Sequence, residues 1–174
     1  SKKSAYVLDR TGLDRFLFEQ AVKAGAEVKT EHFETFQYND DHVDVKTSEG
    51  VYQTKILIGA DGANSTVAQQ ANLPMPKNIF VGLQTTASGN FEQSAELWFG
   101  KKIAPNFFAW VVPENEEIAR IGVSTPTSPK PYYERFLETR LNHNGLKPDV
   151  AGVIRFGVMN DTVADKVILV GDAA

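Results

Sequence analysis

The chain has 174 residues, of which 42% are hydrophobic and 23% are charged, the usual composition of a globular protein. The formal net charge is −4 and no basic cluster stands out, which argues against nucleic acid as a partner. The absence of cysteine excludes disulfides and a thiol nucleophile and fits a cytoplasmic setting, and no apolar run approaches the roughly 18 residues of a membrane span.

The first 76 residues predict a helix followed by a meander of strands. The helix is expected over 11–24, where apolar residues recur at helical spacing, with Thr11 as its cap and Gly25 at its end. Its inward face is expected to hold Leu13, Phe16, Leu17, Ala21 and Ala24. Strands are expected over 27–30, 33–38, 43–47 and 51–58, and a short helix over 64–71. Because residues 56–58 are apolar on both faces, the last strand is expected at the centre of a sheet.

The remaining residues predict a second layer, a mostly antiparallel sheet with one helix. Strands are expected over 79–88, 95–99, 107–112 and 118–124, with closing strands over 154–158 and 166–170. A helix is expected over 132–141, with Tyr133, Phe136, Leu137 and Leu141 facing inward. The sequence therefore predicts two layers of different sheet type.

Two loops share one pattern, in which a buried strand runs into Gly and Asp. They are Ile56-Leu-Ile-Gly-Ala-Asp-Gly-Ala-Asn-Ser-Thr-Val67 and Val167-Ile-Leu-Val-Gly-Asp-Ala-Ala174. Glycine lets the backbone approach a phosphate closely, a helix N-terminus offers free N–H groups, and a carboxylate at a strand end can accept a sugar hydroxyl. One such loop alone is better explained as an ordinary turn with a capping Asp. The two together predict a dinucleotide held between them.

The same residues resemble the FAD-dependent family with the para-hydroxybenzoate hydroxylase fold, over nearly the whole chain. The matching segments are Arg10, Leu13-Asp14-Arg15, Ala21, Gly25-Ala26, Gly59-Ala-Asp-Gly-Ala-Asn-Ser-Thr-Val67 and Gly171-Asp-Ala-Ala174. The resemblance implies that Asp61 and Gly62 lie near the FAD pyrophosphate, a motif also linked to the nicotinamide cofactor. It further implies that Gly171 and Asp172 bind the ribitol of the flavin, and that Arg10 approaches the FAD.

Three points weigh against parts of this assignment. Arg10 is also explained as a solvated surface residue. The family commonly has an arginine after the valine at position 67, where this chain has Ala68. Asp61 itself is not expected to face a phosphate, because like charges repel; ordering the loop, or bonding a hydroxyl or water, is the more natural role.

An aromatic strand is the other informative segment. Phe108, Trp110 and Val112 share one face, and Gly122 on the next strand leaves space, an arrangement that suits an apolar ligand but also plain sheet core. The spacing resembles the Tyr-x-Trp-x-Phe-Pro of geranylgeranyl reductases, although two of the four positions differ in Phe108-Ala-Trp-Val-Val-Pro113. Flavin halogenases have a comparable Trp-x-Trp-x-Ile-Pro. The resemblance implies that Phe108, Trp110, Pro113 and Gly122 line a channel for an isoprenoid tail.

Other candidate residues carry less chemistry. Ser65 is expected to cap a helix, and His32, His42 and His143 lack the spacing of metal ligands. No side-chain acid or base and no metal site is therefore expected, and the flavin is expected to perform the chemistry.

These observations combine into one expectation: an α/β (α+β) fold with a partial FAD-binding Rossmann-like layer at 1–76 and 152–174 and a mostly antiparallel substrate sheet at 77–151. The function implied by the resemblance is reduction of alkene bonds in a polyprenyl substrate by reduced FAD. A flavin monooxygenase or halogenase is the alternative. The expected partners are an apolar or lipid substrate, NAD(P)H or ferredoxin as electron donor, and a peripheral membrane contact. A Gly-x-Gly-x-x-Gly turn is not found, so the isolated chain is expected to be an inactive ligand-binding fragment that holds FAD weakly.

Overall fold

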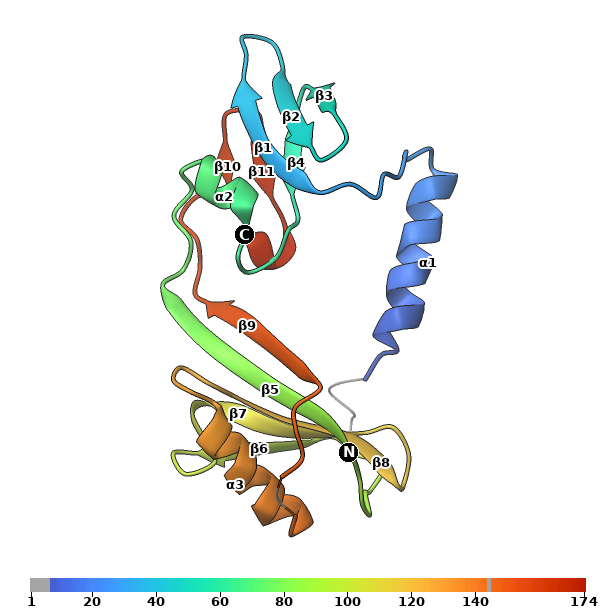
Figure 1. Ribbon diagram of the computed structural model, residues 1–174, viewed down its shortest axis with the longest axis vertical. Helices are drawn as coiled ribbons and strands as arrows, with labels where there is room; N and C mark the ends of the chain where they lie inside the picture. The colour runs from blue at the N-terminus through green and yellow to red at the C-terminus, as the bar shows by residue number, and fades with distance from the viewer. Residues whose placement is uncertain (1–6, 144) are drawn as a thin grey trace.

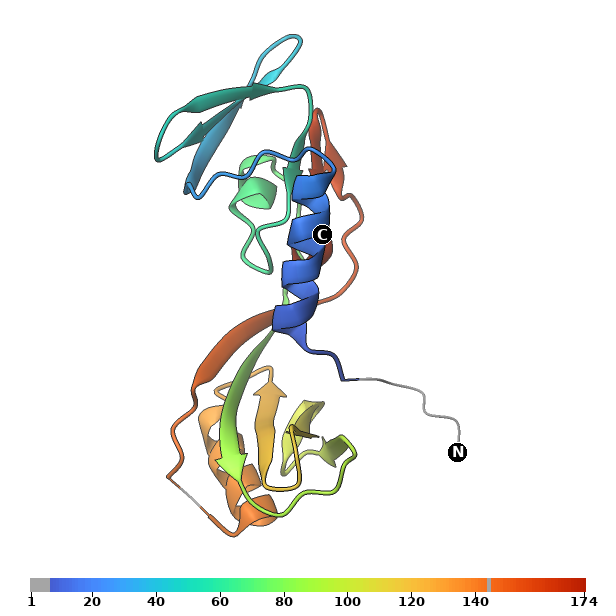
Figure 2. The ribbon, with the colours of Figure 1, turned by 90° about the vertical axis from the view of Figure 1, so that its right-hand side faces the viewer.

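The computed structural model describes residues 7–143 and 145–174. Figure 1 shows an upper part with two small sheets and a lower part with one larger sheet backed by a helix. Strands β5 (Asn78–Ser88) and β9 (Val150–Phe156) belong to the lower sheet; β5 begins and β9 ends at the segments that join the two parts (Figures 1 and 2). The predicted α/β (α+β) class is confirmed, with antiparallel pairing in most of the sheets.

The N-terminal helix α1 (Arg10–Lys23) forms where a helix is predicted, but its cap and its packing differ. Asp9 is the cap rather than Thr11, because the Asp9 carboxylate accepts a hydrogen bond from the Gly12 N–H at 3.1 Å. No side chain of α1 is buried, and exposure of 36% to 56% is found for Leu13, Phe16, Leu17, Phe18 and Val22. The expected inward face is therefore uncovered in the described part of the chain. The strand predicted over 27–30 does not form.

The upper part begins with an antiparallel meander of β1 (Phe33–Tyr38), β2 (Val43–Thr47) and β3 (Val51–Thr54). The single strand predicted over 51–58 is wrong, because the chain turns after β3. At this turn Thr54 Oγ1 donates a hydrogen bond to the Ile56 carbonyl at 2.9 Å. The residues beyond the turn form β4 (Leu57–Gly59), which joins a different sheet.

The second upper sheet has the order β10-β11-β4, with β10 at Val163–Ala164 and β11 at Val167–Leu169. Strand β11 pairs antiparallel with β10 and parallel with β4. Within the described residues β4 lies at the edge, with Ile56 and Ile58 exposed, so the predicted central position is not observed. A buried cluster joins this sheet to α2 (Thr66–Gln70) and consists of Val67, Ala68, Leu73, Met159, Val167 and Leu169.

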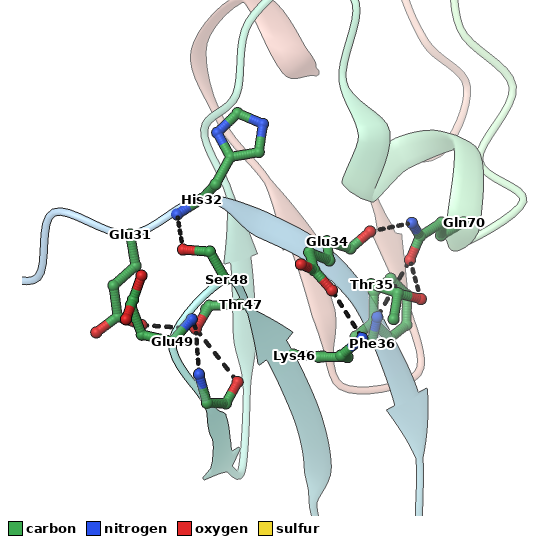
Figure 3. Close-up of polar contacts among 11 residues, drawn as sticks. Glu31, His32, Glu34, Thr35, Phe36, Lys46, Thr47, Ser48, Glu49 and Gln70 are labelled. Carbon is green, nitrogen blue, oxygen red and sulfur yellow. Dashed lines mark hydrogen bonds and ion pairs between the residues drawn. The ribbon is translucent and has the colours of Figure 1, made fainter.

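Gln70, the last residue of α2, attaches this helix to the edge of β1. Its side-chain carbonyl accepts hydrogen bonds from the Phe36 N–H at 3.1 Å and from Thr35 Oγ1 at 3.0 Å (Figure 3). Its amide nitrogen donates to the Glu34 carbonyl at 3.1 Å. The side chain thus pairs with backbone groups of β1 as a neighbouring strand would, and it holds α2 against the meander.

The lower sheet has the order β6-β7-β8-β5-β9, with antiparallel pairing throughout. Its other strands are β6 (Glu96–Gly100), β7 (Ala104–Pro113) and β8 (Ile118–Thr125). Helix α3 (Lys130–Leu141) packs on one face and buries Tyr133, Phe136 and Leu137, as predicted, with Leu141 partly buried. Because β9 pairs with β5 as far as Phe156, the domain boundary expected at residue 151 lies inside a strand of this sheet.

The described ranges, 7–143 and 145–174, contain no helix long and apolar enough to cross a membrane. In the same residues no three His, Asp or Glu side chains lie where they could hold a metal ion together.

One ion pair connects α3 to the edge of the lower sheet. The Arg140 guanidinium donates to both carboxylate oxygens of Glu96, at 2.7 Å and 3.0 Å, and Trp98 Nε1 donates to the same carboxylate at 2.7 Å. These bonds, those from Arg140 first, hold the pKa of Glu96 below its ordinary value although burial opposes ionisation.

We predict that Arg140→Met lowers the free energy of unfolding by about 1–3 kcal/mol at neutral pH, because the charged partner of Glu96 is lost. Since the pKa of Glu96 is depressed in the folded chain, the stabilisation is present above the unfolded-state pKa and is lost as pH falls through the folded-state pKa. Urea unfolding of both proteins across the acid range checks this. Equal stability at neutral pH would contradict it.

Candidate functional site

The two Gly-Asp loops meet because the strands before them are neighbours. Strands β4 and β11 pair in parallel with Gly59 opposite Leu169, and the Val170 N–H donates to the Gly59 carbonyl at 3.0 Å. Parallel neighbours end at the same edge of a sheet, so the segments after Gly59 and after Val170 leave from one place. The structure therefore brings Asp61-Gly62 and Gly171-Asp172 to the same end of the β10-β11-β4 sheet.

The Asp61 carboxylate is directed at its own loop. It accepts hydrogen bonds from Ser65 Oγ at 2.6 Å, from the Thr66 N–H at 2.7 Å and from the Val67 N–H at 3.2 Å. Burial works against ionisation of the carboxyl group, but these bonds together outweigh it and place the pKa of Asp61 below its ordinary value. Asp61 orders the loop as an ionised acceptor.

The N-terminus of α2 is therefore already occupied by side chains. Ser65 is the cap, as predicted, and its Oγ accepts from the Ala68 N–H at 2.8 Å. Asp61 accepts from the N–H groups of Thr66 and Val67, the two residues before Ala68. The expectation that this terminus offers free N–H groups to a phosphate is wrong for these three residues.

Two glycines provide open space at the strand ends. Gly62 has φ +80° and Gly171 has φ +64°, in the left-handed region that favours glycine. A Cβ built on either would meet no other atom within 4 Å. Asp172, in the 3₁₀ turn η1 (Gly171–Ala173), is exposed beside this space. A ligand can thus approach the backbone closely at both loops, which is what a bound dinucleotide requires.

Arg10 is not brought to these loops. It is the first residue of α1 and pairs with Asp14 at 3.4 Å, with about three quarters (73%) of its side chain exposed. Helix α1 stands to one side of the upper sheets in Figure 1. The role expected for Arg10 stays a prediction.

Phe108 and Trp110 of β7 lie on the face of the lower sheet opposite α3, because the residues that alternate with them, Ala109 and Val111, pack in the core with α3. Trp110 pairs with Gly122 of β8, and a Cβ on Gly122 would overlap the Trp110 indole. The indole itself fills the space expected beside Gly122, and its Nε1 donates to Gln84 Oε1 at 3.0 Å. Gly152 on β9 has open space instead, because a Cβ there would meet nothing within 4 Å.

Phe108 belongs to a chain of aromatic rings. It stacks on Phe107 with ring centroids 4.5 Å apart and lies 6.1 Å from Trp110. Phe107 in turn contacts Phe80 at 4.8 Å and Phe156 at 6.4 Å. Pro113, the remaining residue expected here, ends β7 opposite Ala119, away from this cluster.

A cavity of about 410 Å³ opens at the end of the lower sheet nearest the upper part. Its lining combines aromatic and polar residues: Lys77, Asn78, Ile79, Phe80, Asn106, Pro126 and Phe156. None of these residues was expected in a site. Phe80 and Phe156 lie on β5 and β9, two strands that are far apart in the sequence and pair in the folded chain. The sequence shows an aromatic residue in each segment, but it does not show that the two segments are neighbours.

Comparison with known proteins identifies relatives. The family model described as FAD binding domain matches residues 1–174. The digeranylgeranylglycerophospholipid reductases of Methanocaldococcus jannaschii and Methanothrix thermoacetophila are 29% and 32% identical, over 99% and 97% of this chain. They are matched over 49% and 48% of their own length, so the chain spans about half of each.

Solved structures agree. A geranylgeranyl bacteriochlorophyll reductase-like protein of Thermoplasma acidophilum superposes with a TM-score of 0.84 at 25% identity, covering 100% of this chain and 50% of that protein. The flavin-dependent halogenase CmlS has a TM-score of 0.69 at 15% identity, covering 99% of this chain and 37% of its own, and shares the fold alone. The predicted resemblance to geranylgeranyl reductases is thereby confirmed.

We predict that Asp61→Asn lowers the free energy of unfolding by about 1 kcal/mol at neutral pH, because the amide is a weaker acceptor for the loop N–H groups. The pKa of Asp61 is depressed in the folded chain, so its contribution is present above the unfolded-state pKa and is lost as pH falls through the folded-state pKa. Asp172→Asn is the matched control, since Asp172 makes no side-chain hydrogen bond to the described residues. Equal urea midpoints for both variants would refute the prediction.

We predict that Gly122→Ala destabilises the protein by about 1–3 kcal/mol, because the new methyl group would overlap the Trp110 indole and lie 2.8 Å from the Leu83 carbonyl oxygen. Gly152→Ala is the control and is expected to be tolerated, since the space beside it is open. Chemical denaturation of the two variants measures the difference. A Gly122→Ala variant as stable as Gly152→Ala would show that the indole does not rest on residue 122.

Proposed function

The chain belongs to the family of FAD binding domains, and from that premise we propose that the protein is an FAD-dependent oxidoreductase that reduces alkene bonds of a polyprenyl substrate. The observation that carries the proposal is the meeting of two open, glycine-containing loops at the shared end of β4 and β11. The similarity to digeranylgeranylglycerophospholipid reductases supports a geranylgeranyl-type substrate.

Under this proposal four residues would hold FAD: Asp61, Gly62, Gly171 and Asp172. Gly62 and Gly171 give the backbone room for close approach, and Asp61 keeps the first loop in shape through its hydrogen bonds to Ser65, Thr66 and Val67. Asp172 is exposed and free to accept a hydroxyl hydrogen bond. Arg10 is a fifth candidate from the family resemblance, without support from its position.

The substrate would lie on the aromatic face of the lower sheet. Phe108 and Trp110 provide an apolar surface, Gly122 lets the indole lie flat on the sheet, and Pro113 ends the strand. The cavity lined by Phe80 and Phe156 extends this surface toward the upper part. Such a surface excludes water from an alkene and orients it by shape. Reduced FAD, when bound, supplies the hydride, so we assign no side-chain acid or base.

The domain division proposed with this function places FAD on residues 1–76 and 152–174 and substrate on 77–151, except that residues 152–156 belong to the lower sheet as part of β9. The proposed partners are an apolar lipid substrate and an electron donor, NAD(P)H or ferredoxin. A peripheral membrane contact, which a lipid substrate favours, and a cytoplasmic location are part of the same proposal. Because the chain shares its fold with a flavin-dependent halogenase, a flavin monooxygenase or halogenase is the alternative function.

The test is single turnover of the intact protein after anaerobic reduction of its bound FAD. We expect a digeranylgeranyl lipid to reoxidise the flavin and to gain two hydrogens per alkene reduced, as read by flavin absorbance and mass spectrometry. The control is the fully saturated lipid, which cannot accept a hydride. A product that contains oxygen or halogen, formed only when oxygen is admitted, would favour the alternative. No FAD in the purified intact protein, and none bound on titration, would end the proposal.

A further inference from the structure

Arg155 lies on β9 and reaches from the lower sheet to the upper part. It stands opposite Ile79 of β5, at the end of the lower sheet that is nearest the upper part (Figure 1). Its guanidinium donates hydrogen bonds to the Ala63 carbonyl and to the Pro76 carbonyl at 2.9 Å, with a longer bond to Asn64 Oδ1 at 3.5 Å. One side chain of the substrate sheet is thus bonded to the loop that begins with Asp61 and Gly62.

The close approach of Gly157 to Pro76 marks the same place. Gly157 follows β9 with φ +151°, and a Cβ built there would lie 3.1 Å from Pro76 Cβ. The two segments that join the upper and lower parts therefore come close at Pro76 and Gly157, leaving no room for a side chain at residue 157 beside Pro76. A rotation of one part against the other would have to break the hydrogen bonds from Arg155 to Ala63 and Pro76.

Arginine suits this position for a geometric reason. Its planar guanidinium presents several N–H donors in a fixed fork, so it can hold two carbonyl groups that the chain places far apart in sequence. All three acceptors of Arg155 are uncharged, and it forms no ion pair with any Asp or Glu of the described residues. Because these hydrogen bonds are directional, they fix the position of the loop at Ala63 and Asn64 relative to β9.

We infer that Arg155 is a positioning residue that sets the cofactor loop at Asp61–Asn64 against the aromatic face of the lower sheet. The inference rests on the proposed function, because the loop matters to catalysis only if it holds FAD. Arg155 then fixes the distance between the flavin and the alkene, without touching either. Misplacement of reacting groups by about 1 Å can cost on the order of 100-fold in rate.

The experiment compares two ways of reoxidising the reduced flavin in the intact protein at saturating FAD, below the temperature at which unfolding begins. Reoxidation by the alkene requires the flavin to be aligned with the sheet, whereas reoxidation by dissolved oxygen does not. We expect Arg155→Met to slow the alkene-driven rate by about 10-fold or more and to leave the oxygen-driven rate within about two-fold. Arg155→Lys keeps the charge but not the fork, so we expect an intermediate rate.

Arg135→Met is the matched control, because Arg135 also donates to a backbone carbonyl, that of Lys102, but lies on the outer helix α3. It should leave both rates unchanged. If Arg155→Met unfolds, Arg155→Lys and Asn64→Ala carry the same comparison. An alkene-driven rate equal to that of the unaltered protein in the folded Arg155 variants would overturn the inference and leave the proposed function intact. Failure of the unaltered protein to bind FAD or reduce the alkene would instead overturn the proposed function, and the inference with it.

Discussion

The parallel pairing of β4 with β11 is the interaction on which the site depends. It joins residues about a hundred positions apart in the chain and brings the segments after Gly59 and Val170 to one edge of the sheet. A buried cluster that includes Val67 of α2 and Val167 and Leu169 of β11 packs this sheet against α2 and stabilises the pairing. Without it, Gly62 and Gly171 would be two unrelated turns. With it, their open left-handed backbones lie at the same end of one sheet.

A second constraint links that space to the lower sheet. The upper part holds the glycine loops and the lower part holds the aromatic face, so the proposed reaction between FAD and an alkene requires a defined geometry between the parts. Arg155 and the close approach of Gly157 to Pro76 lie beside the two segments that connect the parts. The sheet is in turn kept rigid by α3 on its other face, where Tyr133, Phe136 and Leu137 are buried.

Much of the fold could be predicted from the sequence, because local periodicity decides it. The meander, the strands of the lower sheet and the buried face of α3 follow from alternation and helical spacing. The break after Thr54 could not be predicted, since the alternation continues through it and only pairing with β11 draws Leu57 away. Choice of Asp9 over Thr11 as cap was likewise undetermined, because both residue types are good caps.

Candidate site residues could be predicted where they belong to a sequence motif. They could not be predicted where their role depends on which residues the strand register places opposite one another. Gly122 suggests space in the sequence, but pairing opposite Trp110 places the indole over it. Arg155 lies among apolar residues of a strand and carries no motif; its role depends on two carbonyl groups that come together only in the folded chain. The same holds for Phe80 and Phe156, whose rings lie 6.0 Å apart and which both contact Phe107.

The most direct test of a single slot between the two loops is a double-mutant cycle on FAD affinity, with Gly62→Ala and Gly171→Ala in the intact protein. Each added methyl group would occupy space that is now open at one loop, and because both positions have positive φ, the urea midpoint of each variant is measured alongside to separate backbone strain from lost ligand contact. If one ligand contacts both loops, each variant weakens FAD binding in a flavin fluorescence titration, and the combined loss differs from the sum of the two. Unchanged FAD affinity in both single variants would contradict the account.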